Sequence, residues 1–198
     1  MAVQRNHDVI IVGAGPSGIQ CALSLHRFDF DIVTVARRSP FGLRRIIDVP
    51  EDEADISLRV SADLARKNVD EFIARRIPLV WGSAKTIQWS GGLWEVNTED
   101  ILLRGKRVIL AVGAPTEGRF GIDLSDLEEL ETDDEGRIVL DDAYNTLYRG
   151  LHAVGEAASG YVRTLSCALG TGDGVARAVA SRILKERAAR ATEIKAVA

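Results

Sequence analysis

The amino-terminal part of the chain contains two short apolar runs with a helical segment between them. The runs Val9–Val12 and Ile32–Val35 consist almost entirely of valine and isoleucine, which is typical of buried parallel strands. Between them, Ser17–Arg27 carries apolar residues at helical spacing. Because parallel strands need a crossover connection, and a helix makes it right-handed, this pattern predicts a parallel β-α-β unit.

The middle of the chain changes from helical to alternating spacing. Ser61–Arg76 has the apolar pattern of an amphipathic helix, and Pro78–Val80 begins a strand region. Three short segments that alternate or run apolar follow, with turn residues between them: Ala84–Trp89, Leu93–Asn97 and Ile101–Leu103. Short strands joined by short turns pair in antiparallel order, so we expect a small β-meander.

The last part of the chain returns to strands and a helix. We expect a buried parallel strand over Arg107–Val112, short strands over Gly136–Leu140 and Leu151–Val154, and a long helix over Val175–Arg190. The whole order predicts the α/β class: a Rossmann-like domain with a parallel sheet and a small antiparallel meander. A length of 198 residues fits one domain over residues 1–198.

An acidic connector over about residues 119–135 interrupts this order. Between Asp123 and Glu135 it carries eight acidic residues: Asp123, Asp126, Glu128, Glu129, Glu131, Asp133, Asp134 and Glu135. We interpret it as a solvated connection, and a docking face for a basic protein is the alternative.

The first strand runs into a glycine-rich turn that has the spacing of a dinucleotide-binding fingerprint. In Gly13-Ala14-Gly15-Pro16-Ser17-Gly18, Gly13 permits the tight turn, Gly15 leaves room for a pyrophosphate, and Gly18 lets the helix pack on the strands. The amino-terminus of the following helix presents its positive dipole end to the phosphates. A turn with a purely structural role is the alternative, but the strand before it and the helix after it favour a dinucleotide site.

Composition narrows the classes of partner. The formal net charge of −4 gives no electrostatic reason to expect nucleic acid or an anionic membrane surface. No apolar run is long enough to span a bilayer, and residues 1–7 lack a signal-peptide core, so we expect a cytoplasmic protein. His7, His26 and His152 are scattered without metal-ligand spacing, so no metal site is predicted.

Two arginines, Arg37 and Arg38, follow the second strand at the place where an acidic residue usually binds the adenosine ribose. Arginine there can accommodate a 2′-phosphate, which makes NADP the competing ligand for the fingerprint. A solvated loop is the simpler interpretation of the pair.

Three motifs in order resemble the FAD domain of the thioredoxin reductase family. They are the fingerprint, the strand that ends in Val112-Gly113-Ala114, and the late run Gly150–Glu156 followed by Gly172–Ala178. The resemblance extends from Asp8 to about Leu184. It implies that Gly13, Gly15, Pro16, Ser17 and Gly18 hold the FAD pyrophosphate and that Val112, Gly113 and Ala114 close over the adenosine side. It places Gly155 and Glu156 at the ribityl hydroxyls, and Ser166, Cys167 and Ala168 near the flavin pyrimidine edge.

The chain also departs from that family. The inserted NADPH-binding domain and its Cys-x-x-Cys pair are absent, because Gly113-Ala114-Pro115 leads through the acidic connector almost directly to Gly136–Leu140. Glu156 replaces the usual Asp, and Val112 replaces a Thr. We therefore expect an FAD-dependent oxidoreductase whose electron donor and acceptor are separate. The alternatives are a flavin- or nucleotide-binding redox module without turnover, and an NADP-dependent reductase with one Rossmann site.

The two cysteines, Cys21 and Cys167, are far apart in sequence and predict no disulfide framework. Cys21 lies on the apolar face of the first helix, where it is expected to pack as a small hydrophobe. The resemblance places Cys167 close to the flavin ring, which makes it the candidate catalytic side chain, with packing as the alternative. The family also implies a homodimer formed through the FAD domains.

Overall fold

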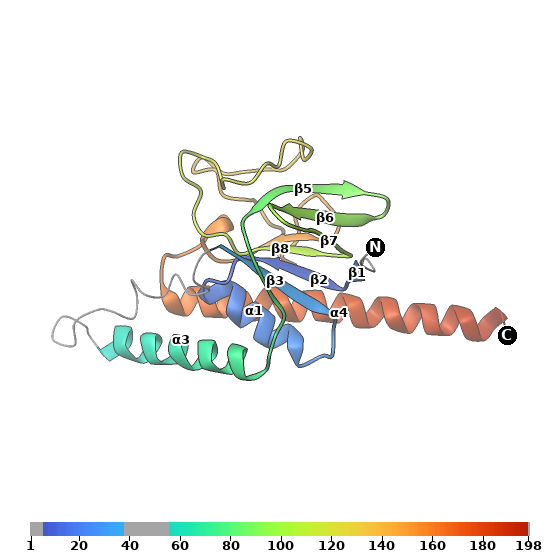
Figure 1. The fold of residues 1–198 in the computed structure, drawn as a ribbon, viewed down its shortest axis with the longest axis horizontal. Helices are drawn as coiled ribbons and strands as arrows, with labels where there is room; N and C mark the ends of the chain where they lie inside the picture. The colour runs from blue at the N-terminus through green and yellow to red at the C-terminus, as the bar shows by residue number, and fades with distance from the viewer. Residues whose placement is uncertain (1–5, 38–55, 198) are drawn as a thin grey trace.

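The computed structural model describes residues 6–37 and 56–197, which form two sheets and a layer of helices. The larger sheet lies in the middle, with helices α1, α3 and α4 on one side and the smaller sheet on the other (Figure 1). Successive side chains of the buried strands point alternately toward the helices and toward the smaller sheet, so the same strands contribute to both cores. Val9 and Ile11 belong to the core on the helix side, whereas Ile10 and Val12 belong to the core beneath the smaller sheet.

The larger sheet is wholly parallel, with the strand order β4-β3-β2-β8-β9. Its strands are β2 (Val9–Val12), β3 (Ile32–Ala36), β4 (Leu79–Trp81), β8 (Val108–Leu110) and β9 (Leu151–Ala153). The predicted α/β class and the β-α-β unit at the start of the chain are confirmed. The order reverses beside β2, so the loops after β2 and β8 lie at the switch point where ligands of such sheets bind.

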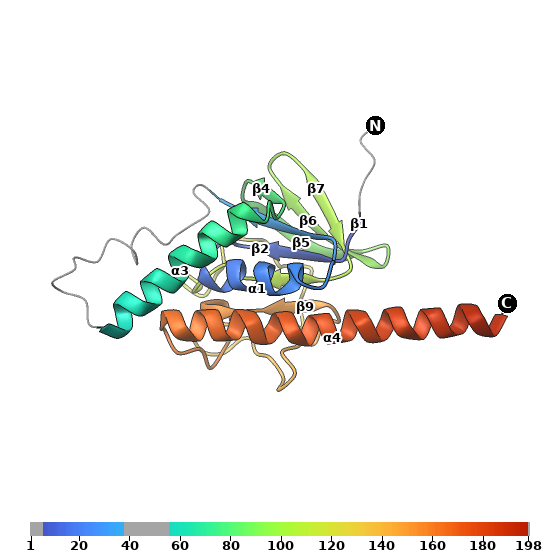
Figure 2. The same cartoon turned by 90° about the horizontal axis from the view of Figure 1, so that it is seen from below.

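Three helices cover one face of this sheet: α1 (Pro16–His26), α3 (Ile56–Ala74) and α4 (Leu165–Val197). Figure 2 shows α1 lying between the other two, and the pairs α1–α3 and α1–α4 are both in contact. The carboxyl-terminal part of α4 extends beyond both sheets (Figures 1 and 2). Within the described residues, no helix combines the length and the apolar character that a bilayer crossing requires.

The smaller sheet is the expected meander with one added strand. The strands β5 (Ala84–Ser90), β6 (Leu93–Thr98) and β7 (Leu102–Gly105) pair in antiparallel order, and β1 (Asn6–His7) pairs with β7 in parallel. Sequence analysis missed β1, because a strand of two residues has no measurable periodicity. Trp94 of β6 is buried between this sheet and the larger one, and its indole N–H donates to the backbone oxygen of Arg149 at 3.1 Å.

Several predicted elements differ in extent from the structure. Gly136–Leu140 is not a strand: Ile138 is buried but forms only isolated bridges, since Asp133 closes a turn by accepting from the backbone N–H of Arg137. The last helix begins at Leu165 rather than Val175 and runs through the glycine cluster. The helix predicted from Ser61 begins at Ile56 and ends at Ala74 instead of Arg76, whose φ of 52° is incompatible with a continuing helix.

The connection over residues 111–150 contains no named helix or strand, and its acidic part lies at the surface. Leu127 is buried, and Leu124 and Leu130 pack against the same core beneath the smaller sheet. The acidic residues next to these leucines, such as Glu128 and Glu131, are exposed. The connector is therefore a surface layer held down by its leucines.

Candidate nucleotide-binding site

The fingerprint turn joins β2 to α1 and approaches the end of β8 very closely. Gly13 has a φ of +113°, and a Cβ there would lie 2.1 Å from the backbone oxygen of Ala111. A Cβ on Gly18 would lie 2.1 Å from the backbone oxygen of Gly13. Both positions therefore exclude every residue except glycine, one for its backbone angle and contact and the other for its contact.

Gly15 differs from its two neighbours, because a Cβ at this position would meet no atom within 4 Å. Gly15 is the N-cap of α1, it provides no side-chain cap, and the first turn of the helix contains Pro16 but no acidic residue. The amino-terminus of α1 is thus open, uncapped by a side chain and free of negative charge. These are the properties that an anion-binding helix terminus needs.

Ser17 is the point at which distant segments meet this turn. A Cβ on Gly155 would lie 2.2 Å from Ser17 Oγ, and a Cβ on Gly172 would lie 2.5 Å from the backbone oxygen of Ser17. Gly155 follows β9, and Gly172 belongs to α4. The structure therefore brings together the fingerprint, the Gly155-Glu156 pair and the early part of α4.

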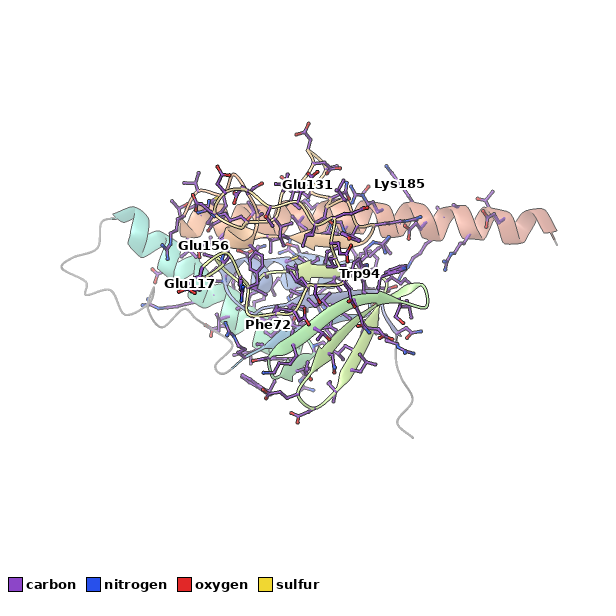
Figure 3. All side chains as sticks on the ribbon, turned by 90° about the horizontal axis from the view of Figure 1, so that it is seen from above. Phe72, Trp94, Glu117, Glu131, Glu156 and Lys185 are labelled. Atoms are coloured by element: carbon purple, nitrogen blue, oxygen red, sulfur yellow. The ribbon has the colours of Figure 1, made fainter. Side chains whose placement is uncertain are left out.

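Glu156 lies in the single-turn helix η1 (Gly155–Ala157), toward the amino-terminal end of α4 (Figure 3). Its half-buried carboxylate forms an ion pair with the guanidinium Nε of Arg163 at 2.7 Å, and the Arg163 side chain is largely exposed. The carboxylate is thus positioned at the rim of the site and keeps acceptor capacity for a hydroxyl-bearing ligand.

The segment Val112-Gly113-Ala114 lies beyond the end of β8 and next to the fingerprint. The backbone N–H of Ala111 donates to the backbone oxygen of Val12 at 2.8 Å, which continues the parallel pairing of β2 and β8. Val112 packs against the core beneath the smaller sheet, and Gly113 has a φ of +80°. Ala114 is exposed. The predicted strand over Arg107–Val112 is therefore shorter, and its last residues form a turn at the site.

The amino-terminus of α4 is capped by a residue that sequence analysis did not select. Thr164 Oγ1 accepts from the backbone N–H of Cys167 at 3.1 Å, and the backbone oxygen of Thr164 accepts from Ala168. Ser166 is exposed, Cys167 is half-buried and Ala168 is buried. A threonine directly before a helix is a common N-cap residue, but the glycines that follow concealed the helix in the sequence.

Tyr161 lies close to this helix start and was also missed. Its hydroxyl donates to the backbone oxygen of Thr164 at 2.8 Å. Burial, followed by the nearby Cys167 and Glu156, raises the pKa of Tyr161 to about 12, so the phenol stays protonated. Its single O–H therefore stays committed to Thr164, close to Glu156 and Cys167.

Comparison with known proteins agrees with this geometry. Residues 8–172 match the sequence family described as pyridine nucleotide-disulphide oxidoreductase. The chain belongs to this family. A thioredoxin reductase from Ureaplasma parvum is 26% identical over 133 residues, which cover 67% of this chain and 41% of that protein. The chain thus spans less than half of the length of this curated relative.

Solved structures show the same fold. A thioredoxin reductase from Streptococcus pyogenes has a TM-score of 0.71 at 17% identity, and the alignment covers 92% of this chain and 99% of that one. A ferredoxin-flavin thioredoxin reductase from Clostridium acetobutylicum has a TM-score of 0.71 at 13% identity, with 91% of this chain and 99% of that chain covered. The resemblance to the thioredoxin reductases is thereby confirmed.

Two further sets of candidate residues remain: the arginines that follow β3, and the cysteine on α1. Arg37 is exposed immediately after β3, at the edge of the sheet where the fingerprint lies, and Arg38 falls outside the described residues. Cys21 lies on the opposite side of α1 from solvent and is fully buried, as expected for a packing residue. Burial, together with the nearby Asp173, raises the pKa of the Cys21 thiol well above its usual range, which makes it a poor nucleophile.

Proposed function

We propose that this chain binds FAD and acts as a flavoprotein oxidoreductase. The observation that carries this proposal is the convergence on Ser17 of the fingerprint, Gly155 and Gly172. In a domain that binds only a mononucleotide, the segments around Gly155 and Gly172 would contact no ligand. A long ligand with a pyrophosphate at one point and a ring system farther on accounts for all three.

Each segment has a distinct role toward such a ligand. Gly13, Gly15, Pro16, Ser17 and Gly18 would hold the pyrophosphate, because the amino-terminus of α1 is open at Gly15. Glu156 would accept hydrogen bonds from ribityl hydroxyls, and the start of α4 would present backbone N–H groups to the flavin pyrimidine edge. FAD, when bound, supplies the electron-transfer chemistry. The positive end of α4 would stabilise negative charge on the reduced ring.

The source of electrons is proposed to be a separate molecule. The sequence contains neither a second glycine fingerprint between Gly113 and Leu151 nor a Cys-x-x-Cys pair anywhere. The structural neighbour from Clostridium acetobutylicum is named for ferredoxin and flavin together, which supports a protein donor as one option. A thiol or a small diffusing reductant is the other. We also propose a homodimer, which the family resemblance implies, and a cytoplasmic location.

Gly15→Val tests the cofactor directly. Because a Cβ at Gly15 would have no protein atom within 4 Å, the valine should enter the space proposed for the pyrophosphate. We expect the wild-type protein to be yellow or to take up FAD. The variant should fold with a Tm close to that of flavin-free wild-type protein but remain colourless in absorption spectra.

Gly18→Val is the contrasting variant, since its Cβ would collide with the Gly13 backbone oxygen. It should lose both stability and FAD. A wild-type protein that does not bind FAD but binds NADPH tightly would overturn the proposal. The NADP-dependent reductase would then be favoured, and the position of Arg37 supports that alternative. A yellow protein that no donor reduces would instead be a flavin-holding module.

A further inference from the structure

Trp81 is an unusual residue at the ligand-binding edge of the larger sheet. It is the last residue of β4, the outer strand next to β3, and its side chain is 56% exposed. Its register partner is Ala36, and the backbone N–H of Gly82 donates to the oxygen of Ala36 at 2.8 Å. Trp81 therefore lies beside the residue that precedes Arg37, at the carboxyl ends of the strands.

The alternation of β4 fixes the side of the sheet on which Trp81 lies. Leu79 packs against the core on the helix side, together with Ala36, whereas Val80 packs against the core beneath the smaller sheet. Trp81 is two residues after Leu79 and so projects to the helix side. The open amino-terminus of α1 at Gly15 is on the same side and at the same edge.

The spacing between Trp81 and the fingerprint suits one extended ligand. β2, β3 and β4 are consecutive neighbours, so the ends of β2 and β4 are two strand spacings, roughly 10 Å, apart. A pyrophosphate at α1 and a ribose at the end of β3 leave the next position, at the end of β4, to the base. Arg37 is exposed at the intermediate position and forms no ion pair with any other described residue.

We propose that Trp81 stacks on the adenine ring of the bound dinucleotide and that Arg37 lies beside the adenosine ribose. This inference rests on the proposed function, because it takes the pyrophosphate position from the fingerprint. An indole face binds a purine by stacking without needing a hydrogen-bond pattern. Trp81 thus selects a dinucleotide over a flavin that lacks adenine.

Binding measurements on flavin-free protein test this role. In Trp81→Ala we expect the Kd for FAD to rise at least about fivefold, the lower end of the usual effect of losing one base–aromatic stack. In Trp81→Phe the Kd should stay near the wild-type value, since an aromatic face remains. Riboflavin 5′-phosphate, which has no adenine, should bind wild-type and Trp81→Ala equally.

Trp89 provides the matched control, because it is 51% exposed on β5 of the smaller sheet. ADP should quench the tryptophan fluorescence of wild-type and Trp89→Phe but not of Trp81→Phe. If the wild-type protein does not bind FAD but ADP still quenches the fluorescence of Trp81, the flavin assignment fails and the proposed adenine contact stands. The inference is overturned if Trp81→Ala binds FAD as tightly as wild-type, or if ADP quenches Trp81→Phe as well. In that outcome Trp81 contacts a partner protein or no ligand.

Discussion

At the scale of a single residue, Cys167 is the candidate catalytic side chain. It lies in the first turn of α4, where its backbone N–H donates to Thr164, and its side chain is half-buried rather than enclosed. If its thiolate attacks a substrate disulfide, Cys167→Ser should suppress thiol-linked turnover and leave the FAD spectrum and folding unchanged. Stopped-flow reduction and absorption spectra measure both.

Cys21→Ser is the control, because Cys21 is fully buried on α1. A hydroxyl there should leave turnover intact and cost stability of about 1–3 kcal/mol, the usual penalty for a poorly paired buried hydroxyl. Equal thiol-linked rates in Cys167→Ser and the wild-type protein would assign Cys167 to packing.

His152 gives the stability of the fold a dependence on pH. Its Nδ1–H donates to the backbone oxygen of Tyr144 at 2.8 Å. Burial, with a smaller contribution from the guanidinium groups of Arg182 and Arg107, lowers the pKa of His152 from 6.5 to about 4. The unfolded chain therefore binds this proton more readily. The stability from neutral His152 is complete above about pH 6.5 and is lost as the pH falls toward about 4.

His152→Gln isolates that effect, since glutamine can donate a similar bond but does not titrate. Between about pH 7 and about pH 4, urea unfolding should show that the wild-type protein loses ~3 kcal/mol more than the variant. Parallel pH profiles for the two proteins would contradict the buried neutral histidine.

At the scale of elements, the contact between α1 and α4 positions the site. Besides the close approach at Gly172, Ser24 Oγ of α1 donates to the Asp173 carboxylate of α4 at 2.6 Å. Gly172→Ala should push the two helices apart, because the added Cβ would lie 2.5 Å from the backbone oxygen of Ser17, which is fixed within α1. We expect a loss of roughly 1–3 kcal/mol in unfolding free energy and weaker FAD binding.

Gly170 is the matched position, since it is exposed on the same helix and a Cβ there would meet nothing within 4 Å. Gly170→Ala should raise stability by about 0.5–1 kcal/mol through its higher helix propensity. Thermal unfolding of both variants checks the pair. A stabilised Gly172→Ala would show that the helices are less tightly apposed.

At the scale of the whole molecule, the connection between β8 and β9 bears on which reductants could reduce the proposed FAD. Nothing between these strands has the fingerprint of a second nucleotide site. NADPH alone should therefore reduce bound flavin slowly, because the connection offers no second fingerprint to orient the nicotinamide against the ring. Rapid anaerobic bleaching by stoichiometric NADPH would contradict this.

Assembly is a second property of the whole molecule. The family resemblance implies association through the FAD domains, and closed two-fold dimers are the commonest soluble assemblies. Analytical ultracentrifugation should show a species of twice the 21.5 kDa chain mass. A single monomeric boundary across the micromolar range would count against the dimer.

The sequence predicted most of the fold wherever a segment carried its own periodicity. The strand runs of β2 and β3, the spacing of α1 and the turns of the meander specify these elements locally, and the structure confirms them. The fingerprint could also be recognised from the sequence, because Gly13 and Gly18 are required by contacts within one strand-turn-helix unit and its neighbouring strand. Cys21 was placed correctly for the same reason: its helix face is apolar.

Only the tertiary structure decided the elements whose local signals conflict with their packing. Gly170, Gly172 and Gly174 predict a break, yet α4 runs through them, because a glycine at 172 is what allows the helix to touch Ser17. Ile138 carries a strand pattern but has no full strand to pair with. The ion pair of Glu156 with Arg163 and the exposure of Trp81 likewise depend on neighbours from other segments. Periodicity records which face of a segment is apolar, whereas the close approach of two segments depends on atoms that are distant in the chain.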